Sequence, residues 1–195
     1  MTQIALFGTS ADPPTVGHQV ILKWLSENYD QVAVWAADNP FKEHGATLEQ
    51  RSAMLELLIQ DLGCENVTVD KRLSDRRSLH TIETAKKIWG EEAEYLLVIG
   101  ADIVGQIHRW YRAKDLLRQV TLLIFPRKGY PIQPEVLKQL TALKSKWQTA
   151  AYVPPSVSSS EYRIEGRSQA VIAAIADYVA AHNLYTIKTA TDDEN

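Results

Sequence analysis

Small residues, hydroxyl groups and one histidine gather between Gly8 and His18, near the start of the chain. The apolar run 3–7 before them predicts a buried strand, and helical spacing of apolar residues over 20–25 predicts a helix after them. A helix that begins near Gly17 offers unpaired N–H groups and a favourable dipole to a phosphate. The His18 side chain can donate to the same anion. The segment therefore predicts a phosphate-binding loop, although by itself it also fits an ordinary strand–helix turn with a surface histidine.

A second predicted strand, 31–38, follows this helix and makes a strand–loop–helix–strand unit. Parallel strands joined by a helix form a right-handed unit whose ligand crevice lies at the carboxyl ends of the strands. The next loop, 39–45, lies at that edge and carries Lys42. We therefore expect Lys42 to face the crevice, against the simpler interpretation of a solvated lysine.

The rest of the chain alternates between segments with the apolar pattern of strands and segments with the apolar spacing of helices. Further strands are predicted at 67–69, 94–99, 119–125 and 149–153, and helices at 47–62, after the segment 76–84, at 135–147 and over the apolar residues Val171, Ile172, Ile175 and Val179. This order predicts an α/β fold with a doubly wound, mostly parallel sheet.

Local signals mark several helix ends. Thr47 and Gln50 have the spacing of a capping box, and Gly63 suits the end of the same helix. Arg51 in the first turn opposes the helix dipole, which indicates a task such as pairing with a carboxylate. Thr81 is the predicted cap of the next helix.

Two later loops carry polar and aromatic side chains to the same edge. Gly100 and Asp102 follow the fourth strand, where the carboxylate suits either a helix cap or a contact with nucleotide hydroxyls or a Mg²⁺ shell. Trp110 stands between two arginines, and its indole face suits a flat cationic ring as well as it suits a core. Loop 154–163 places serines before a helix with Arg163 in its predicted first turn, which is a second anion cradle or a serine-rich linker.

Bulk properties exclude several classes of protein. The 195 residues suit one domain over 1–188 with a polar tail at 189–195, and the contents of 45% hydrophobic and 23% charged residues are those of a globular protein. A net charge of -3 with scattered Lys and Arg argues against a nucleic-acid partner. We find no signal peptide and no membrane span. Cys64 is the single cysteine, so an internal disulfide and a Cys-rich zinc site are excluded and a reducing cytoplasm is expected.

Separated motifs between Ile4 and Tyr185 resemble those of the bacterial-type nicotinate-nucleotide adenylyltransferases, in the same order. They are Thr15-Val16-Gly17-His18 for the [His/Thr]-x-Gly-His signature of the nucleotidyltransferase superfamily, Gly8 to Pro13 for Gly-Gly-Thr-Phe-Asp-Pro, the loop with Lys42 for Pro-x-Lys, Ser78 to Thr84 for Ser-x-Tyr-Thr-x-Asp-Thr, Gly100-Ala101-Asp102 with Trp110 for Gly-x-Asp…Trp, and Val157 to Arg163 for Ile-Ser-Ser-Thr-x-x-Arg. The chain departs from this pattern at Thr9, Ala11, Thr15, His80 and Glu83.

The resemblance implies a Rossmann-like, cytoplasmic enzyme of NAD biosynthesis. It implies transfer of AMP from ATP to nicotinate mononucleotide, with release of pyrophosphate and formation of deamido-NAD. Mg²⁺ would accompany ATP, and no metal is held by the protein itself. Neither nucleic acid nor membrane is an expected partner, and a homo-oligomer is compatible with the sequence.

The resemblance also implies roles for individual residues. The catalytic group is His18, Lys42 and Arg163. The ATP-binding group is Gly8, Thr9, Ser10, Thr15, His18, Gly100, Asp102, Ser158, Ser159 and Arg163. The group that binds the pyridine nucleotide is Lys42, His80, Thr81 and Trp110.

Two alternative functions remain open from the sequence. A pantetheine-phosphate adenylyltransferase usually has threonine at the position of Thr15, but the Gly-x-Asp…Trp pairing and the Arg-Ser-x-x-Thr loop argue against it. A nucleotide-binding regulator without turnover is the other alternative, and the departures from the family pattern motivate it. Release of pyrophosphate from ATP in the presence of different acceptors separates all three.

Overall fold

The structure is a computed structural model that describes residues 1–39, 42–155, 157–166 and 168–185. The predicted polar tail at 189–195 lies outside the described residues. So do Pro40 and Phe41, which precede Lys42 in its loop.

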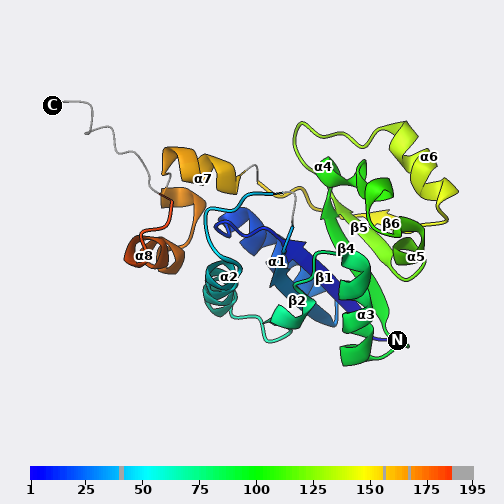
Figure 1. Cartoon of the computed structure of the whole chain (residues 1–195), viewed down its shortest axis with the longest axis horizontal. Helices are drawn as coiled ribbons and strands as arrows, with labels where there is room; N and C mark the ends of the chain where they lie inside the picture. Colours follow the sequence, from blue (N-terminus) through cyan, green and yellow to red (C-terminus); the bar gives the residue numbers. More distant parts are fainter. Residues whose placement is uncertain (40–41, 156, 167, 186–195) are drawn as a thin grey trace.

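A parallel sheet forms the centre of the molecule (Figure 1). Within the described residues it has six strands in the order β3-β2-β1-β4-β5-β6, and every neighbouring pair is parallel. The strands are β1 (Gln3–Thr9), β2 (Gln31–Ala36), β3 (Val67–Val69), β4 (Glu94–Gly100), β5 (Thr121–Phe125) and β6 (Lys146–Thr149). The chain winds outward from β1 in both directions, so the predicted doubly wound fold is confirmed.

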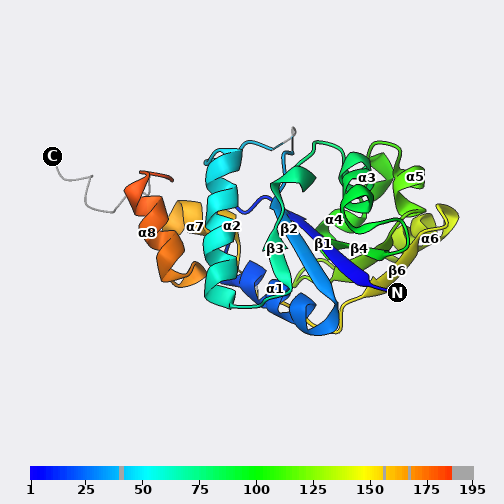
Figure 2. The same cartoon turned by 90° about the horizontal axis from the view of Figure 1, so that it is seen from below.

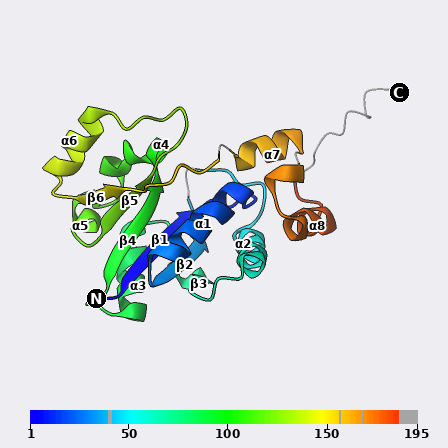
Figure 3. The same ribbon diagram turned by 180° about the vertical axis from the view of Figure 1, so that it is seen from behind.

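Helices cover both faces of this sheet. They are α1 (Val16–Asn28), α2 (Leu48–Leu62), α3 (Ser78–Trp89), α4 (Ala101–Val104), α5 (Ala113–Leu117), α6 (Pro134–Ala142), α7 (Ser159–Glu165) and α8 (Ala173–Ala181), with short 3₁₀ turns η1 (Lys71–Leu73), η2 (Ile107–Arg109) and η3 (Ser168–Ala170). Figure 2 shows α3 and α5 across the sheet from α1. Helices α7 and α8 lie beside α2 at one end of the molecule, away from α5 and α6 (Figure 3).

The alternation of side chains along β1 explains the two layers. Ala5 and Phe7 point into a core shared with α1, α2 and α8, whereas Ile4 and Leu6 point into a core shared with α3 and α5. Successive residues of a strand face opposite sides, and a strand buried on both sides must therefore be apolar throughout. The apolar run at the start of the chain is the consequence of this position in the sheet.

Helix α2 has the predicted ends. The Gln50 N–H donates to Thr47 Oγ1 at 3.2 Å, and the Thr47 N–H donates to Gln50 Oε1 at 2.9 Å. Gly63 closes the helix with a φ of 65°, a left-handed conformation that costs glycine little. Both predictions are confirmed.

The sequence pattern predicted the end of the fifth-to-sixth-strand helix and the whole sixth strand too far toward the C-terminus. Helix α6 ends at Ala142 rather than at 147, and β6 spans Lys146–Thr149 rather than 149–153. All four residues of β6 are exposed at the sheet edge. The strand therefore lacks the alternation of apolar and polar residues from which a strand is predicted. Pairing with β5, in which Trp147 lies opposite Leu122, determines the strand instead.

The predicted cap of α3 was also wrong. The helix begins at Ser78 with Arg77 as its N-cap, so Thr81 lies inside the first turn. Asp75 Oδ1 accepts the Arg77 N–H at 2.8 Å, and this contact starts the helix early. The buried Thr81 hydroxyl donates to the Leu73 carbonyl at 3.0 Å.

Candidate nucleotide site

Loops at the carboxyl edge of the sheet bring the predicted polar residues together. Strands β1, β4 and β5 are adjacent and parallel, so the segments that follow Thr9, Gly100 and Phe125 leave the sheet at the same edge. The loop after β1 leads into α1, which begins at Val16, one residue before the predicted start near Gly17. The edge at which the crevice was expected is therefore formed by the loops after β1, β4 and β5.

His18 is held at both ring nitrogens. Its Nδ1 accepts the main-chain N–H of Thr15 at 3.0 Å, and its Nε2 lies 2.8 Å from Thr9 Oγ1. Burial, and the nearby cations Arg127 and Lys42, lower the pKa of His18 from 6.5 to about 4. The hydrogen-bond network therefore assigns a neutral ring that carries its proton on Nε2 near pH 7.

Thr15 lies behind the histidine. It is fully buried, caps α1, and places its hydroxyl 2.9 Å from the same Nδ1 of His18. A buried hydroxyl in this position supports the imidazole ring from its Nδ1 side and leaves Nε2 on the opposite side. Thr9, the departure at the second glycine, presents its hydroxyl on that other side.

Lys42 contacts the loop after β1, as the sequence predicted. Its Nζ donates to Ser10 Oγ at 3.0 Å. Partial burial lowers the pKa of Lys42, and the charge of Arg163 lowers it further. Two cations therefore approach each other here, and an anion between them would relieve the repulsion.

The serine-rich loop packs on the start of α1. Ser158 caps α7, where its Oγ accepts the Glu161 N–H at 3.1 Å, and Ser159 Oγ donates to the Pro13 carbonyl at 2.8 Å. The loop lies directly against Gly17, where a Cβ would be in ordinary van der Waals contact with the Val157 carbonyl oxygen, at 3.4 Å. The two predicted anion cradles are thus in contact.

Arg163 differs from its predicted place in the helix. Because the Ser158 cap starts α7 at Ser159, Arg163 lies in the last turn rather than the first. Its Nη1 donates to the Asp12 carbonyl and lies 3.6 Å from Asp12 Oδ2. The guanidinium still reaches the loop after β1, but it does so from the end of a short helix.

Asp102 is paired with a cation that sequence reasoning missed. It lies in the first turn of α4, and its Oδ2 accepts a hydrogen bond from Arg127 Nη1 at 2.6 Å. Arg127 follows β5, and its charge is the second cause of the lowered pKa of His18. The position of Arg127 after a predicted strand was the signal that could have found it. Gly100 leaves room for this carboxylate, because a Cβ at that position would collide with Asp102 Oδ1.

Of the residues predicted for the pyridine nucleotide, His80 and Thr81 lie in the first turn of α3, whereas Lys42 contacts the loop after β1. His80 meets the ring of Tyr111 edge-on, with 5.9 Å between ring centroids, and the Arg77 guanidinium lies 4.2 Å from the Tyr111 centroid. Trp110 is partly buried against the core under α3. The Thr81 side chain is buried and donates to the Leu73 carbonyl, so it does not face the proposed pyridine site. Only the main chain of Thr81, in the first turn of α3, lies at the predicted place. Tyr111 and Arg77 were not singled out from the sequence.

Arg51 does not pair with a carboxylate as predicted. It is 2% exposed, and its Nη1 donates to the main-chain carbonyls of Ser10 and Ala37 at 2.8 and 2.9 Å. Carbonyl oxygens at loop ends are strong acceptors, so the cation ties together the loops after β1 and β2. From its position at the start of α2, Arg51 therefore stabilises the two loops and not the helix dipole.

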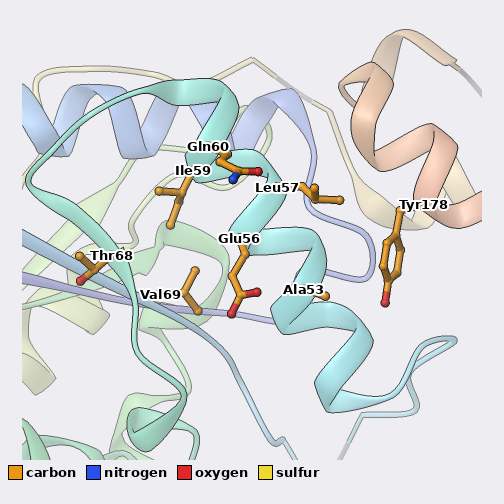
Figure 4. Close-up of a pocket in the computed structure, with 8 residues that line it drawn as sticks. All are labelled: Ala53, Glu56, Leu57, Ile59, Gln60, Thr68, Val69 and Tyr178. Atoms are coloured by element: carbon orange, nitrogen blue, oxygen red, sulfur yellow. The ribbon is translucent and has the colours of Figure 1, made fainter.

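A shallow groove lies apart from these residues, between α2, β3 and α8 (Figure 4). Its described lining is Ala53, Glu56, Leu57, Ile59, Gln60, Thr68, Val69 and Tyr178. None of these side chains belongs to the predicted site. The carboxyl edge of the sheet, and not this groove, holds the candidate chemistry.

The described helices include none that is both long and apolar enough to cross a membrane. A parallel sheet with a histidine and several cations at its carboxyl edge is the arrangement typical of nucleotide-binding α/β proteins. The chain belongs to the cytidylyltransferase-like family, whose family model matches residues 6–165.

Individual relatives show which members of the family this chain is similar to. The chain is 45% identical to a probable nicotinate-nucleotide adenylyltransferase of Synechocystis sp., over 94% of this chain and 98% of the relative. It is 28% identical to a protein of the same name from Carboxydothermus hydrogenoformans, again over 94% and 98%. The resemblance indicated by the sequence motifs is therefore confirmed.

A solved structure shares the fold. Plasmodium falciparum nicotinic acid mononucleotide adenylyltransferase, complexed with NaAD, superposes with a TM-score of 0.80 at 19% identity, over 95% of this chain and 98% of that one. At this identity the comparison establishes the architecture alone. It agrees with the predicted doubly wound sheet.

Proposed function

We propose that the protein transfers the adenylyl group of ATP to nicotinate mononucleotide, forming deamido-NAD and pyrophosphate. The observation that carries the proposal is the convergence of a neutral histidine, His18, with the cations Lys42, Arg163 and Arg127 at one sheet edge. An aromatic group beside α3 provides a place for a second, ring-bearing substrate. The names of the relatives support the same reaction.

The chemistry needs no covalent enzyme intermediate. A phosphate oxygen of nicotinate mononucleotide attacks the α-phosphorus of ATP, the new P–O bond forms, and the bond to the bridging oxygen of the β-phosphate breaks. Pyrophosphate leaves with the electron pair of that bond. The protein contributes position and compensation of negative charge, which are the main sources of catalysis in phosphoryl transfer.

His18 supplies a neutral donor. Because the Thr15 N–H occupies Nδ1, the proton on Nε2 is the one offered to a phosphate oxygen. In the structure Thr9 Oγ1 accepts the hydrogen bond from Nε2–H. When ATP binds, the hydroxyl must therefore turn away, or the N–H must donate to the hydroxyl and the phosphate together. A donor aimed at charge that develops in the transition state contributes more to rate than to ground-state binding.

Lys42 and Arg163 supply positive charge at the same loop, and Ser10, Ser158 and Ser159 lie among them. Gly8 follows the buried part of β1, where a Cβ would collide with the Trp35 ring, so the close packing beneath the loop requires glycine. We assign this group to the ATP phosphates. We assign Asp102, held by Arg127, to the nucleotide that lies across the ends of β4 and β5.

The pyridine ring is assigned to Trp110 and the start of α3. Helix geometry leaves the N–H groups of Ser78 and Leu79 without acceptors inside the helix, and they suit a carboxylate. The N–H groups of His80 and Thr81 instead bond to the Arg77 carbonyl, at 2.9 and 3.2 Å. The donors are therefore shifted toward the N-terminus relative to the loop predicted from the sequence.

Mg²⁺ is assigned to ATP rather than to a protein site. Within the described residues no group of three or more His, Cys, Asp or Glu side chains is arranged to hold a metal ion. Asp102 is committed to Arg127, and Asp12 to main-chain N–H groups. Mg²⁺ commonly reaches such sites on phosphate oxygens with bound water, so we derive no step that depends on protein ligands for the ion.

A pyrophosphate-release assay tests the proposal. ATP is supplied with nicotinate mononucleotide, nicotinamide mononucleotide or 4′-phosphopantetheine, and product mass is checked for each acceptor. Turnover with the pyridine nucleotides is the expected result. Turnover with phosphopantetheine alone would support the alternative acceptor class, and ATP binding without turnover with any acceptor would support a regulator.

A further inference from the structure

A buried carboxylate joins segments from both ends of the chain. Asp12 is 1% exposed, and its two oxygens accept the N–H groups of Gly45 and Ala46 at 2.8 and 3.1 Å. The hydroxyl of Tyr185, which follows α8, donates to Asp12 Oδ1 at 2.7 Å. The main-chain carbonyl of Asp12 accepts from Arg163.

The ring of Tyr185 fits closely in this place. It packs edge-on against Tyr162 of α7, with 6.3 Å between ring centroids. A Cβ at Gly45 would lie 2.8 Å from the Tyr185 ring, so this approach requires glycine in the loop. Burial and the Asp12 carboxylate raise the pKa of Tyr185, which keeps its hydroxyl protonated as a donor.

The same carboxylate is connected to both cations assigned to the phosphates. Gly45 and Ala46, which donate to it, continue the loop that carries Lys42, and Lys42 contacts Ser10, two residues before Asp12. Arg163 donates to the main-chain carbonyl of Asp12, and its Nη1 lies 3.6 Å from Oδ2. The Asp12 carboxylate therefore anchors the loop that carries Lys42 and lies beside the Arg163 guanidinium.

We propose that Tyr185 is a positioning residue of the nucleotide site, which acts through Asp12 to keep Lys42 and Arg163 directed at the ATP phosphates. This inference rests on the proposed function of the site. The hydroxyl of Tyr185 occupies Oδ1 and limits rotation of the carboxylate. Without it, only the N–H groups of Gly45 and Ala46 hold the carboxylate, and we expect it to turn toward a full ion pair with Arg163. Such a pair would withdraw the guanidinium from a bound phosphate.

The test uses the full-length Tyr185→Phe variant, which removes one hydroxyl and keeps the ring. We expect binding of a non-hydrolysable ATP analogue, measured by calorimetry, to weaken about tenfold, because an Arg163 guanidinium paired with Asp12 is less available to the phosphates. KM for nicotinate mononucleotide should change less than about twofold, since the neighbours of Tyr185 are Asp12, Tyr162 and Gly45 and none of these is assigned to the pyridine ring.

Tyr95→Phe is the matched control. Tyr95 Oη also donates from a buried position, to the Gly90 carbonyl at 2.6 Å, but it lies in the core under α3. Both variants lose stability from the same chemical change, and only Tyr185→Phe should weaken ATP binding. Equal melting-temperature losses with unchanged ATP binding in both would overturn the proposal and leave Tyr185 a structural residue.

A double-mutant cycle separates positioning from general destabilisation. In a Lys42→Ala background, Tyr185→Phe should weaken ATP binding by a smaller factor than in the wild type, because one of the positioned cations is gone. Strictly additive effects would contradict the proposal. Calorimetry needs no acceptor, so a failure of turnover with nicotinate mononucleotide would contradict the proposed reaction without affecting this result.

Discussion

The main-chain N–H of Thr15 donates to Nδ1 of His18 over 3.0 Å, and this bond determines which nitrogen of the ring carries the proton. A cationic ring would need to donate from both nitrogens, which conflicts with the Thr15 N–H that donates to Nδ1. Burial and two nearby cations disfavour the charged form as well. His18 is therefore a neutral Nε2–H donor at the pH of most cells.

The lowered pKa of His18 predicts a pH dependence of stability. The unfolded chain binds a proton near the ordinary pKa of 6.5, whereas the folded ring binds one only near 4. Between these values the unfolded state holds more protons, so the free energy of unfolding should fall as pH falls from about 6.5 to 4 and should be insensitive to His18 above that range. Denaturant unfolding across this range measures the effect, and His18→Gln should show a flatter profile.

Removing the donor should lower the rate of the chemical step. We expect His18→Ala to reduce kcat by roughly 10²-fold, since loss of a donor to developing phosphate charge costs about 2.7–4 kcal/mol. Steady-state pyrophosphate release and circular dichroism measure rate and folding together. His18→Gln keeps an N–H donor and should lose less. A folded alanine variant with near-normal kcat would show that His18 takes no part in the reaction.

Trp110 should serve one substrate more than the other. If its indole stacks on the pyridine, Trp110→Ala raises KM for the pyridine nucleotide at least about fivefold, as stacking contributes on the order of 1 kcal/mol. KM for ATP should stay within about twofold. Trp147→Ala, at an exposed edge position of β6, is the control for loss of an indole. A large loss of stability with equal changes in both KM values would instead make Trp110 part of the core.

The start of α3 should favour the acid over the amide. A carboxylate accepts from both of the N–H groups at Ser78 and Leu79. An amide accepts from one of them through its carbonyl oxygen and turns its NH₂ toward the other, so that this N–H and the facing NH₂ are both left without an acceptor. We predict at least about a tenfold higher kcat/KM for nicotinate mononucleotide than for nicotinamide mononucleotide, on the order of 1.4 kcal/mol.

His80 lies at the edge of the same site. Its Nδ1 lies 3.4 Å from Asp75 Oδ1, and its ring contacts Tyr111. Measurements of kcat/KM for both acceptors from pH 6 to 8 test the preference. A constant preference for the acid supports the main-chain donors, and equal values throughout exclude them.

Local sequence alone determined the phosphate loop, the capped α2 helix and the order of strands and helices. Each depends on contacts between neighbours in the chain, such as the reciprocal bonds of Thr47 and Gln50, or on the apolar run of a strand buried on both faces. Parallel strands then force the loops to one edge, so the meeting of His18, Lys42 and Arg163 was already implied by topology.

Only the tertiary structure decided which partners these side chains have. Asp12 and Tyr185 are 173 positions apart, and no periodicity or cap links them. Arg127 pairs with Asp102 because β5 lies beside β4, and the two residues follow the ends of these neighbouring strands. The position of β6 was decided by pairing with β5, since an exposed edge strand buries too little apolar surface to leave a pattern in its residues. Long-range contacts of this kind depend on the packing of the whole sheet, which short-range sequence signals do not encode.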